Sequence, residues 1–396
     1  MDTIAIIGGG IGGLASAILL ARKGFHVSVF DKAATPQPVG AGFLLQPPGQ
    51  AVLQKLGVLD SVLKYAVPIS GLQSKTVSGR TVLDLDYSAL KTPSYTGLGV
   101  QRNDIYQALL SKVLSTDRIK FHWGNEVTQC MPEVSKVTIV SNNEKHDFDL
   151  CILSSGANSI LAYEHFSGRI HRPYGWGCLW TTIDLPQSLA PNILHQRCKG
   201  SSKMMGILPV QNIDGNYQAA LYWSMKSSDI DGINGNNFGA VKNEIEQFWP
   251  DAKQSIASLQ FHDFISAKYN DVWTPKPYNN RLVALGDICH ATSPQLGQGC
   301  TMALLDAWVL SMQLNQNDDL LLASLDNWWA IRRNQLAYVR HLSKLLTPLF
   351  QSDSKALSLF RDWLMAPIGR LPLFNNLQLS TLASDVFLNK AELKLH

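Results

Sequence analysis

The chain has 396 residues, of which 45% are hydrophobic and 16% are charged, and its formal net charge is +3. This composition is typical of a folded globular protein with about two or three structural units. The small net charge, with no basic run between aromatic residues, argues against nucleic-acid binding, and no apolar run reaches the roughly 18 residues of a membrane-spanning helix.

The first predicted element is a strand from Thr3 to Ile7, followed by Gly8-Gly9-Gly10-Ile11-Gly12-Gly13, a helix to about Lys23 and a strand from His26 to Phe30. In this β-α-β unit Gly8 permits a tight turn, Gly10 lets the backbone approach a pyrophosphate, and Gly13 lets helix and strand pack closely. Asp31 ends the second strand at the spacing of a ribose ligand. The pattern predicts dinucleotide binding without separating FAD from NAD(P).

The character of the chain changes at Arg172 and stays changed to Ala267. Before Arg172 we predict a helix from Arg102 to Leu114 and strands from Glu126 to Cys130 and from Lys136 to Val140. After it, apolar and β-branched stretches bounded by Gly, Asn and Pro predict antiparallel strands of a second domain, with a helical interruption. The stretches are Trp176 to Ile183, Lys203 to Pro209 and Tyr217 to Met225, and the interruption is Gly235 to Trp249.

The last third returns to a buried strand, Arg281 to Leu285, then a Gly-Asp turn and a helix from about Gly299 to Leu314. From Leu320 onward the pattern is mostly helical and contains Trp328-Trp329, Arg332-Arg333 and Arg340. We expect this helix to pack on the first domain with its basic face in water. Docking of that face on a membrane or a partner is the alternative.

The segment Gly286-Asp287-Ile-Cys-His290-Ala-Thr-Ser-Pro294-Gln-Leu-Gly297-Gln298-Gly299 is more specific than the glycine fingerprint. With that fingerprint, Arg102, a Gly-Ala-Asn-Ser turn at 156–159 and Asp306, it resembles the FAD-dependent aromatic hydroxylases, the group of para-hydroxybenzoate hydroxylase and the ubiquinone-pathway hydroxylases. The resemblance covers most of the chain. It implies FAD as cofactor and NADH or NADPH as the possible reductant.

The resemblance also implies roles for single residues. Gly286 and Asp287 would bind the ribityl chain, and the helix beginning at Gly299, Cys300 and Thr301 would direct N–H groups at the flavin ring. Thr301 stands where the family usually has asparagine. Pro294 and Gly299 would shape the loop beside the flavin, whereas His290 would hold the turn by a hydrogen bond. The expected cofactor-binding residues are Gly8, Gly10, Gly13, Asp31, Arg102, Gly286, Asp287, Gly299, Cys300 and Thr301.

The second domain is expected to cover the substrate side of the flavin with an apolar pocket. The candidate lining residues are Trp180, Met205, Tyr222, Trp223 and Pro294. Strand alternation lets only about half of any strand's side chains face such a pocket, so the others would belong to the core. No catalytic side chain, paired carboxylates or metal-ligand pattern is recognised.

Two positions depart from the family pattern in the stretch DLCILSSGANSILAYEHF, residues 149–166. Ser155 replaces the usual aspartate and Ala162 the usual arginine, and the joint loss predicts a neutral turn. FAD binding is expected to survive. Reduction by NADH or NADPH is the step placed in question, and a partner reductase is the other source of electrons.

The predicted fold is α/β, with a Rossmann-like FAD-binding domain, a second, mostly antiparallel sheet and a C-terminal helical region. The FAD-binding domain would comprise residues 1–70, 97–165 and 276–318, the substrate domain 71–96 and 166–275, and the helical region 319–396 packed on the FAD-binding domain. The six cysteines form no C-x-x-C pair, which favours reduced thiols and a cytoplasmic location.

The predicted function is an FAD-dependent monooxygenase that hydroxylates an aromatic or quinone-like small molecule with dioxygen through a flavin C4a-hydroperoxide. A flavin-dependent reductase or dehydrogenase on the same fold is one alternative. A non-catalytic FAD-binding protein is the other.

Overall fold

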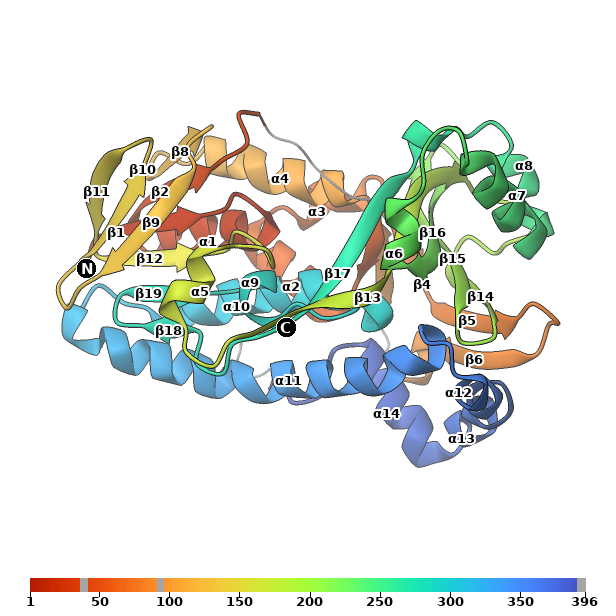
Figure 1. Cartoon of the computed structure of the whole chain (residues 1–396). Helices are drawn as coiled ribbons and strands as arrows, with labels where there is room; N and C mark the ends of the chain where they lie inside the picture. The colour runs from red at the N-terminus through yellow and green to blue at the C-terminus, as the bar shows by residue number, and fades with distance from the viewer. Residues whose placement is uncertain (36–41, 91–95, 390–396) are drawn as a thin grey trace.

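Two β-sheets dominate the molecule, with the long helix α11 (Leu321–Phe350) running along both (Figure 1). The computed structural model describes residues 1–35, 42–90 and 96–389. The predicted combination of a Rossmann-like part, a mostly antiparallel second sheet and a helical C-terminal region is confirmed.

The first sheet, within the described residues, has the strand order β18-β19-β12-β1-β2-β8 and is parallel apart from β18. Alternate side chains of a buried parallel strand face opposite layers. Ile4 and Ile6 therefore pack toward helices α1 and α10, whereas Ala5 and Ile7 pack toward the small sheet β9-β10-β11. The bounds are β1 (Thr3–Ile7), β2 (His26–Asp31), β8 (Ile119–Trp123), β9 (Val127–Pro132), β10 (Val137–Ser141), β11 (Glu144–Phe148), β12 (Leu150–Leu153), β18 (Tyr278–Asn279), β19 (Leu282–Ala284), α1 (Ile11–Arg22), α4 (Arg102–Leu114), α5 (Leu161–His165), α9 (Asp287–His290) and α10 (Gly299–Gln313).

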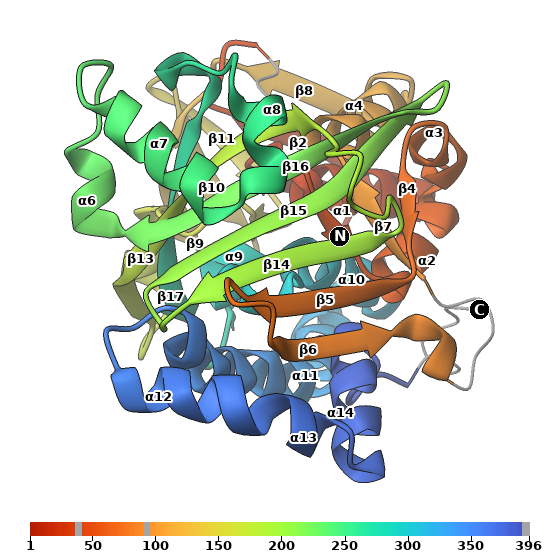
Figure 2. The same ribbon diagram turned by 90° about the vertical axis from the view of Figure 1, so that its right-hand side faces the viewer.

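The second sheet, in the part of the chain that the structure describes, has the order β17-β13-β16-β15-β14-β5-β6. Its neighbours are antiparallel except β14 and β5. Helices α6, α7 and α8 lie on its outer side in Figure 2, and α12, α13 and α14 lie beyond its β6 edge. The bounds are β5 (Gly71–Thr76), β6 (Thr81–Asp86), β13 (Ile170–Asp184), β14 (Ile193–Lys199), β15 (Lys203–Ile213), β16 (Asn216–Lys226), β17 (Ile265–Trp273), α6 (Ser227–Asp231), α7 (Phe238–Phe248) and α8 (Lys253–Ile256).

A small sheet, β3-β7-β4, joins the two larger ones. Its contact with the second sheet requires glycine, because a Cβ on Gly99 would lie 1.8 Å from the carbonyl oxygen of Pro209 in β15. The bounds are β3 (Phe43–Leu45), β4 (Val67–Ile69), β7 (Gly97–Val100), α2 (Pro47–Leu56) and α3 (Leu59–Leu63).

The C-terminal helices pack on both halves of the molecule, not only on the FAD-binding part as expected. The first half of α11 packs on α10 through Trp328, while Leu349 and Phe350 at its end pack against Val82 and Met204 of the second sheet. The chain continues with α12 (Lys355–Phe360), a π-helical turn (Arg361–Met365), α13 (Ala366–Gly369) and α14 (Pro372–Leu382).

The basic residues of α11 also differ from expectation. Arg333 is exposed, but Arg332 and Arg340 are buried, so the predicted basic face in water is wrong for these two. Each has an acidic partner that compensates its burial: Asp306 for Arg332 and Asp271 for Arg340. Among the described residues, no helix is long and apolar enough to cross a bilayer.

Candidate active site

The glycine-rich turn after β1 leaves an open approach to the first turn of α1. Gly8 has φ +105°, and a Cβ on Gly13 would lie 2.0 Å from the carbonyl oxygen of Gly8, so glycine is required at both positions. At Gly10 an added Cβ would meet no heavy atom of the described residues within 4 Å. This open site beside the unpaired N–H groups of a helix start can admit a pyrophosphate.

Asp31 closes one side of this turn. Its Oδ2 accepts a hydrogen bond from the Gly9 backbone N–H at 2.7 Å, and its Oδ1 accepts one from Ala33 at 2.9 Å. Both bonds fix the carboxylate at the end of β2. Each oxygen keeps a free lone pair, which is what a ribose diol needs.

The start of α10 gathers three residues that are far apart in sequence. A Cβ on Gly299 would lie 3.8 Å from Oδ1 of Asp287. Burial raises the pKa of the Cys300 thiol to about 12, the positive charge of Arg102 opposes this rise, and Asp287 adds to it. Arg102, Asp287 and Cys300 therefore share one electrostatic environment at a helix N-terminus, where an anionic or polar ligand is stabilised.

The Gly286 turn depends on a buried network. Gly286 has φ +72° and ψ −148°, a conformation that favours glycine, and its N–H donates to Oδ2 of Asp306 at 3.1 Å. His290 Nε2 lies 2.5 Å from the same oxygen, and Nε of Arg332 donates to Oδ1 of Asp306 at 2.8 Å. The expected structural role of His290 agrees with this geometry. The network joins the turn to α10 and α11.

The charges of this network support one another. Burial alone would raise the pKa of Asp306, but His290 and Arg332 outweigh it and hold that pKa below its usual value. Burial would likewise lower the pKa of His290, but Cys289 and Asp306 outweigh it and hold that pKa well above its usual value.

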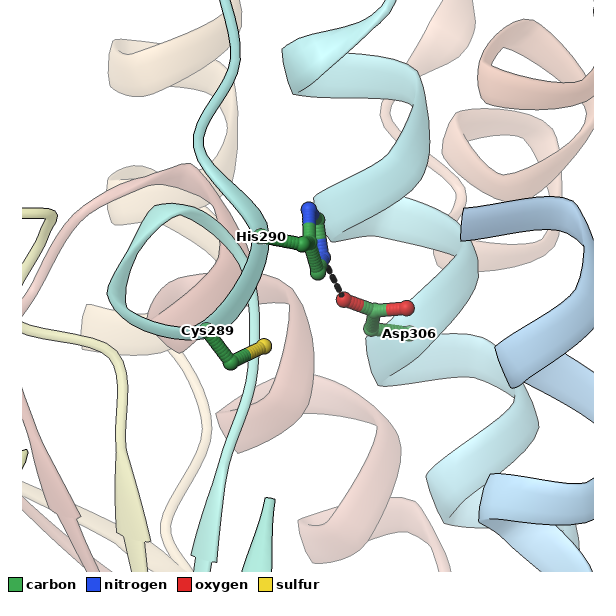
Figure 3. A group of neighbouring side chains, drawn as sticks. All are labelled: Cys289, His290 and Asp306. Atoms are coloured by element: carbon green, nitrogen blue, oxygen red, sulfur yellow. Dashed lines mark hydrogen bonds and ion pairs between the residues drawn. The ribbon is translucent and has the colours of Figure 1, made fainter. Parts of the chain in front are cut away.

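Figure 3 shows Cys289, His290 and Asp306 as neighbouring side chains, and one possible metal-ligand atom of each lies within 4.8 Å of the others. Three observations favour a hydrogen-bond network at this place. Asp306 already accepts from three donors, the Arg332 cation lies against it, and burial raises the pKa of the Cys289 thiol. A metal would have to displace a buried ion pair and take up a protonated thiol.

The turn at residues 154–159 has no charged side chain of its own, as the sequence predicts, but a cation contacts it from outside. Ser155 is exposed and donates to Oγ of Ser159 at 2.8 Å, and Ala162 is buried in the core. Arg169, which sequence reasoning missed, brings a cation to the turn through a hydrogen bond to the carbonyl of Ala157 at 3.1 Å. It also donates to the carbonyl of Ile288 at 3.3 Å, so it links this turn to the Gly286 turn.

Gln46, at the start of α2, is a second residue that the sequence did not indicate. Its Oε1 accepts from the Tyr87 hydroxyl at 2.6 Å, and its backbone N–H donates to Oγ1 of Thr301 at 3.4 Å. Its Nε2 is buried without a hydrogen-bond partner among the described residues. Thr301 thus holds the start of α2, and Gln46 presents an unused donor next to it.

A cavity of about 390 Å³ lies between the second sheet, the loop 294–297 and the C-terminal helices. The sheet contributes alternate residues, as the pleat requires: Cys178 and Trp180 from β13, and Tyr222 and Ser224 from β16. The complete lining is Gly42, Phe43, Leu44, Leu72, Leu83, Leu85, Cys178, Trp180, Leu194, Gln196, Met204, Leu208, Tyr222, Ser224, Tyr269, Pro294, Gln295, Leu296, Gly297, Tyr338, Leu342, Leu345, Leu346, Phe350, Gln351, Met365, Phe374, Leu377, Gln378, Thr381 and Leu382.

The five expected pocket residues divide between the two faces of the sheet. Trp180, Tyr222 and Pro294 line the cavity. Met205 and Trp223 do not, and this part of the expectation is corrected: both are fully buried on the opposite face, in the core under α7 and α8. Met204 lines the cavity instead of Met205, because neighbouring residues of a strand face opposite sides of the sheet.

No lining residue within the described chain is Asp, Glu, Lys, Arg or His. Burial raises the pKa of three lining groups, Cys178, Tyr222 and Tyr269, so these three stay neutral. The Tyr222 hydroxyl accepts from Nε2 of Gln196, and the Tyr269 hydroxyl contacts Sγ of Cys178 at 2.6 Å. The cavity is therefore apolar and uncharged.

Together these residues fit a flavin dinucleotide. The open turn at Gly10 suits the pyrophosphate, Asp31 suits a ribose, and the exposed Asp287 lies where α10 begins. The Nε2 of Gln46 gives the same region a donor that has no acceptor among the described residues.

Comparisons with known proteins agree with this geometry. The family model described as "FAD binding domain" matches residues 1–324. The FAD-dependent urate hydroxylase of Klebsiella pneumoniae is 23% identical over 330 residues, which cover 80% of this chain and 83% of that protein. The 2-heptyl-3-hydroxy-4(1H)-quinolone synthase of Pseudomonas aeruginosa is 25% identical over 320 residues, 78% of this chain and 80% of that protein.

A solved structure of Klebsiella pneumoniae HpxO complexed with FAD and uric acid has the same fold, with a TM-score of 0.80 and 20% identity over 97% of both chains. The family match covers well over half of the sequence. The chain belongs to the FAD-binding-domain family, in its group of FAD-dependent aromatic hydroxylases, and its cofactor is FAD.

Proposed function

We propose that this FAD-dependent monooxygenase hydroxylates a neutral, largely apolar aromatic or quinone-like molecule that binds in the cavity below the second sheet. The observation that carries the proposal is the uncharged cavity, which extends from loop 294–297 to the face of β13 and β16. An aromatic ring fits beside Trp180 and Tyr222, whose ring centroids are 5.3 Å apart.

The flavin site is assigned to the residues that converge at the Gly10 and Gly299 helix starts. Gly8, Gly10 and Gly13 would receive the pyrophosphate, Asp31 the adenosine ribose and Asp287 the ribityl hydroxyls. Gly286, Gly299, Cys300 and Thr301 would border the ring, with Arg102 and Gln46 as polar neighbours. Arg169, through its contact with the turn at 154–159, would support the pyrophosphate side.

The bound flavin supplies the reaction with dioxygen, and the chain supplies the surroundings. The N–H groups at the start of α10 stabilise negative charge near Gly299. The apolar lining of the cavity excludes water from the substrate side. Pro294 and Gly297 shape the loop between the flavin site and the cavity.

The substrate must tolerate a site whose described lining residues provide no counter-ion. A carboxylate transferred into this lining would lose its hydration without gaining an ionic partner. The relatives named above act on or bind heteroaromatic rings, which supports a ring substrate. The lack of charge in this chain's cavity supports a neutral one.

The source of electrons is proposed to be NADH or NADPH, with a partner reductase as the second candidate. Ser155 and Ala162 favour the reductase, because the aspartate and arginine of the family pattern are absent. Arg169 favours the nucleotide, because it restores a cation at the same turn.

Anaerobic stopped-flow absorbance tests this proposal. FAD-loaded protein is mixed with NADH or NADPH, with and without alkylphenols and quinolones, and flavin bleaching is followed. Bleaching that a ligand accelerates, followed by a hydroxylated product when oxygen is added, supports a self-sufficient hydroxylase. Absence of bleaching by either nucleotide, with product formed after photoreduction and oxygen, assigns the electrons to a partner reductase. Absence of product in both cases would refute the proposed reaction.

We also propose the domain division and location that the sequence indicates. Residues 1–70, 97–165 and 276–318 would form the FAD-binding domain, and 71–96 with 166–275 the substrate domain; α11 spans both. None of the six cysteines is paired in a disulfide, which is compatible with the proposed cytoplasmic location.

A further inference from the structure

We propose that Ser224 and Gln351 form a donor–acceptor pair that recognises a phenolic or enolic hydroxyl group on the substrate. The inference rests on the proposed function, since it takes the cavity as the substrate site. It assigns a specificity-determining role to two residues that the sequence did not single out.

The pair joins the second sheet to the end of the long helix. Ser224 lies on β16, and Gln351 directly follows α11, where its N–H bonds back to the carbonyl of Thr347 at 2.8 Å. Nε2 of Gln351 donates to Oγ of Ser224 at 2.8 Å. Both residues line the cavity, although only 1% of Ser224 and 5% of Gln351 are exposed.

The pair has unused hydrogen-bonding capacity. Oε1 of Gln351 is buried and has no hydrogen-bond partner among the described residues. The Ser224 hydroxyl accepts from the amide and keeps its own hydrogen to donate. If the amide were turned by 180°, Ser224 would donate to it, and the pair would still present one donor and one acceptor.

The residues next to Ser224 offer few other free polar groups, so the Ser224–Gln351 pair would select the polar group of a substrate here. Met204 and Cys178 flank Ser224 on the adjoining strands β15 and β13. The polar groups of Tyr222 and Cys178 are already engaged with Gln196 and Tyr269. Gln295, whose Nε2 has no hydrogen-bond partner among the described residues, lines the cavity from the loop 294–297 and not from the sheet.

A hydroxyl group matches the pair because it donates one hydrogen bond and accepts another. An ether of the same size can only accept, so Oε1 would stay unsatisfied. A carboxylate can only accept and also carries a charge into an uncharged lining. The expected order of affinity is therefore hydroxyl, then ether, then carboxylate.

Calorimetric titration of the FAD-loaded protein with three matched probes tests the order. The probes are 4-hexylphenol, 4-hexylanisole and 4-hexylbenzoate. We expect the phenol to bind about 10-fold more tightly than the anisole and the benzoate to bind more weakly still. Equal affinities for phenol and anisole would overturn the inference.

Two variants each replace one member of the pair, and a third variant is the control. Gln351→Leu and Ser224→Ala should each reduce the phenol-to-anisole ratio to about 1–3, and the anisole affinity should change little. Gln129→Leu makes the same chemical change at an exposed residue of β9, which does not line the cavity, and should keep the ratio of the unmodified protein. A ratio that persists in both pair variants, with unchanged FAD absorbance showing that they fold, contradicts the assignment.

Failure of the inference differs from failure of the proposed function. If all three probes bind equally, the cavity binds apolar rings and the pair does not select among them. If no probe binds to protein that retains FAD, the cavity is not the substrate site, and both proposals fall.

Discussion

Nε of Arg332 donates a hydrogen bond to Oδ1 of Asp306 at 2.8 Å, and both side chains are almost completely buried. Asp306 also accepts hydrogen bonds from the Gly286 N–H and His290, so the long C-terminal helix is coupled to the turn that borders the proposed flavin site. A buried ion pair of this kind contributes positioning more than stability, but removal of one partner leaves an uncompensated charge.

Asp306→Asn is therefore expected to lower the free energy of unfolding by about 3–5 kcal/mol, because the Arg332 cation remains buried. Urea titration followed by tryptophan fluorescence measures the change. Asp147→Asn is the matched control, since the Lys136–Asp147 pair is exposed to solvent, and it should change stability little. A similar loss in both variants would contradict the buried-pair interpretation.

The pH dependence of stability should depend on His290, whose pKa is raised well above 6.5 in the folded protein. Its contribution is complete below the unfolded pKa of about 6.5 and is lost as the pH rises through the folded pKa. Asp306 has a lowered pKa, so its contribution is present above about 3.8 and is lost as the pH falls further.

The stability advantage of the unmodified protein over His290→Gln should accordingly be larger at pH 6 than at pH 9. Urea midpoints measured at several pH values give this difference. A constant difference across that range would show that folding does not raise the pKa of His290.

Substitution by alanine should have different effects at Gly10 and at Gly13. Gly13→Ala places a Cβ 2.0 Å from the Gly8 carbonyl oxygen and should lower the melting temperature of the apoprotein. Gly10→Ala meets no described heavy atom within 4 Å, so the apoprotein should stay folded while FAD binding weakens by about 10-fold or more. Calorimetry and flavin-fluorescence titration separate the effects. Undiminished FAD affinity in Gly10→Ala would argue against pyrophosphate binding there.

Cys300 should be chemically unreactive although it lies at the proposed flavin site. Burial raises its pKa to about 12, so roughly 1 thiol in 10,000 is ionised at pH 8. Mass spectrometry after iodoacetamide treatment of the apoprotein at pH 8 should show little labelling of Cys300, with free cysteine as the positive control. Rapid labelling would mean that Arg102 lowers the pKa more than burial raises it.

Tryptophans on the two faces of the second sheet should have separable roles. Trp223→Ala removes a fully buried ring and should cost about 3–5 kcal/mol of stability. Trp180→Ala opens the cavity wall and should weaken 4-hexylphenol binding with a smaller loss of stability. Urea titration and calorimetric binding measure both. The reverse pattern would mean that the cavity lies on the other face.

Features set by neighbours in sequence were predictable. The strand Thr3–Ile7, the glycine turn and the helix Arg102–Leu114 all occur where the sequence places them. Such elements depend on side-chain periodicity, glycine conformations and helix ends, which are local properties. Strand alternation also predicted that only some of the candidate pocket residues would reach the pocket.

Each strand of the second sheet has two alternating sets of side chains. Packing decided which of the two sets faces the cavity. Helices α7 and α8 cover the Met205 and Trp223 face, so Met204 and Tyr222 are left for the cavity. The sequence of a strand contains both sets, and its periodicity does not say where a later helix will lie.

The sequence by itself determined that the chain binds a dinucleotide and resembles the flavin hydroxylases, because those signals lie in short segments whose backbone conformation is nearly fixed. Only the tertiary structure brought Arg332 to Asp306, Arg169 to the turn at 154–159 and Gln351 to Ser224. These contacts join residues of different elements, and long-range packing alone fixes which charged and polar groups share a buried site.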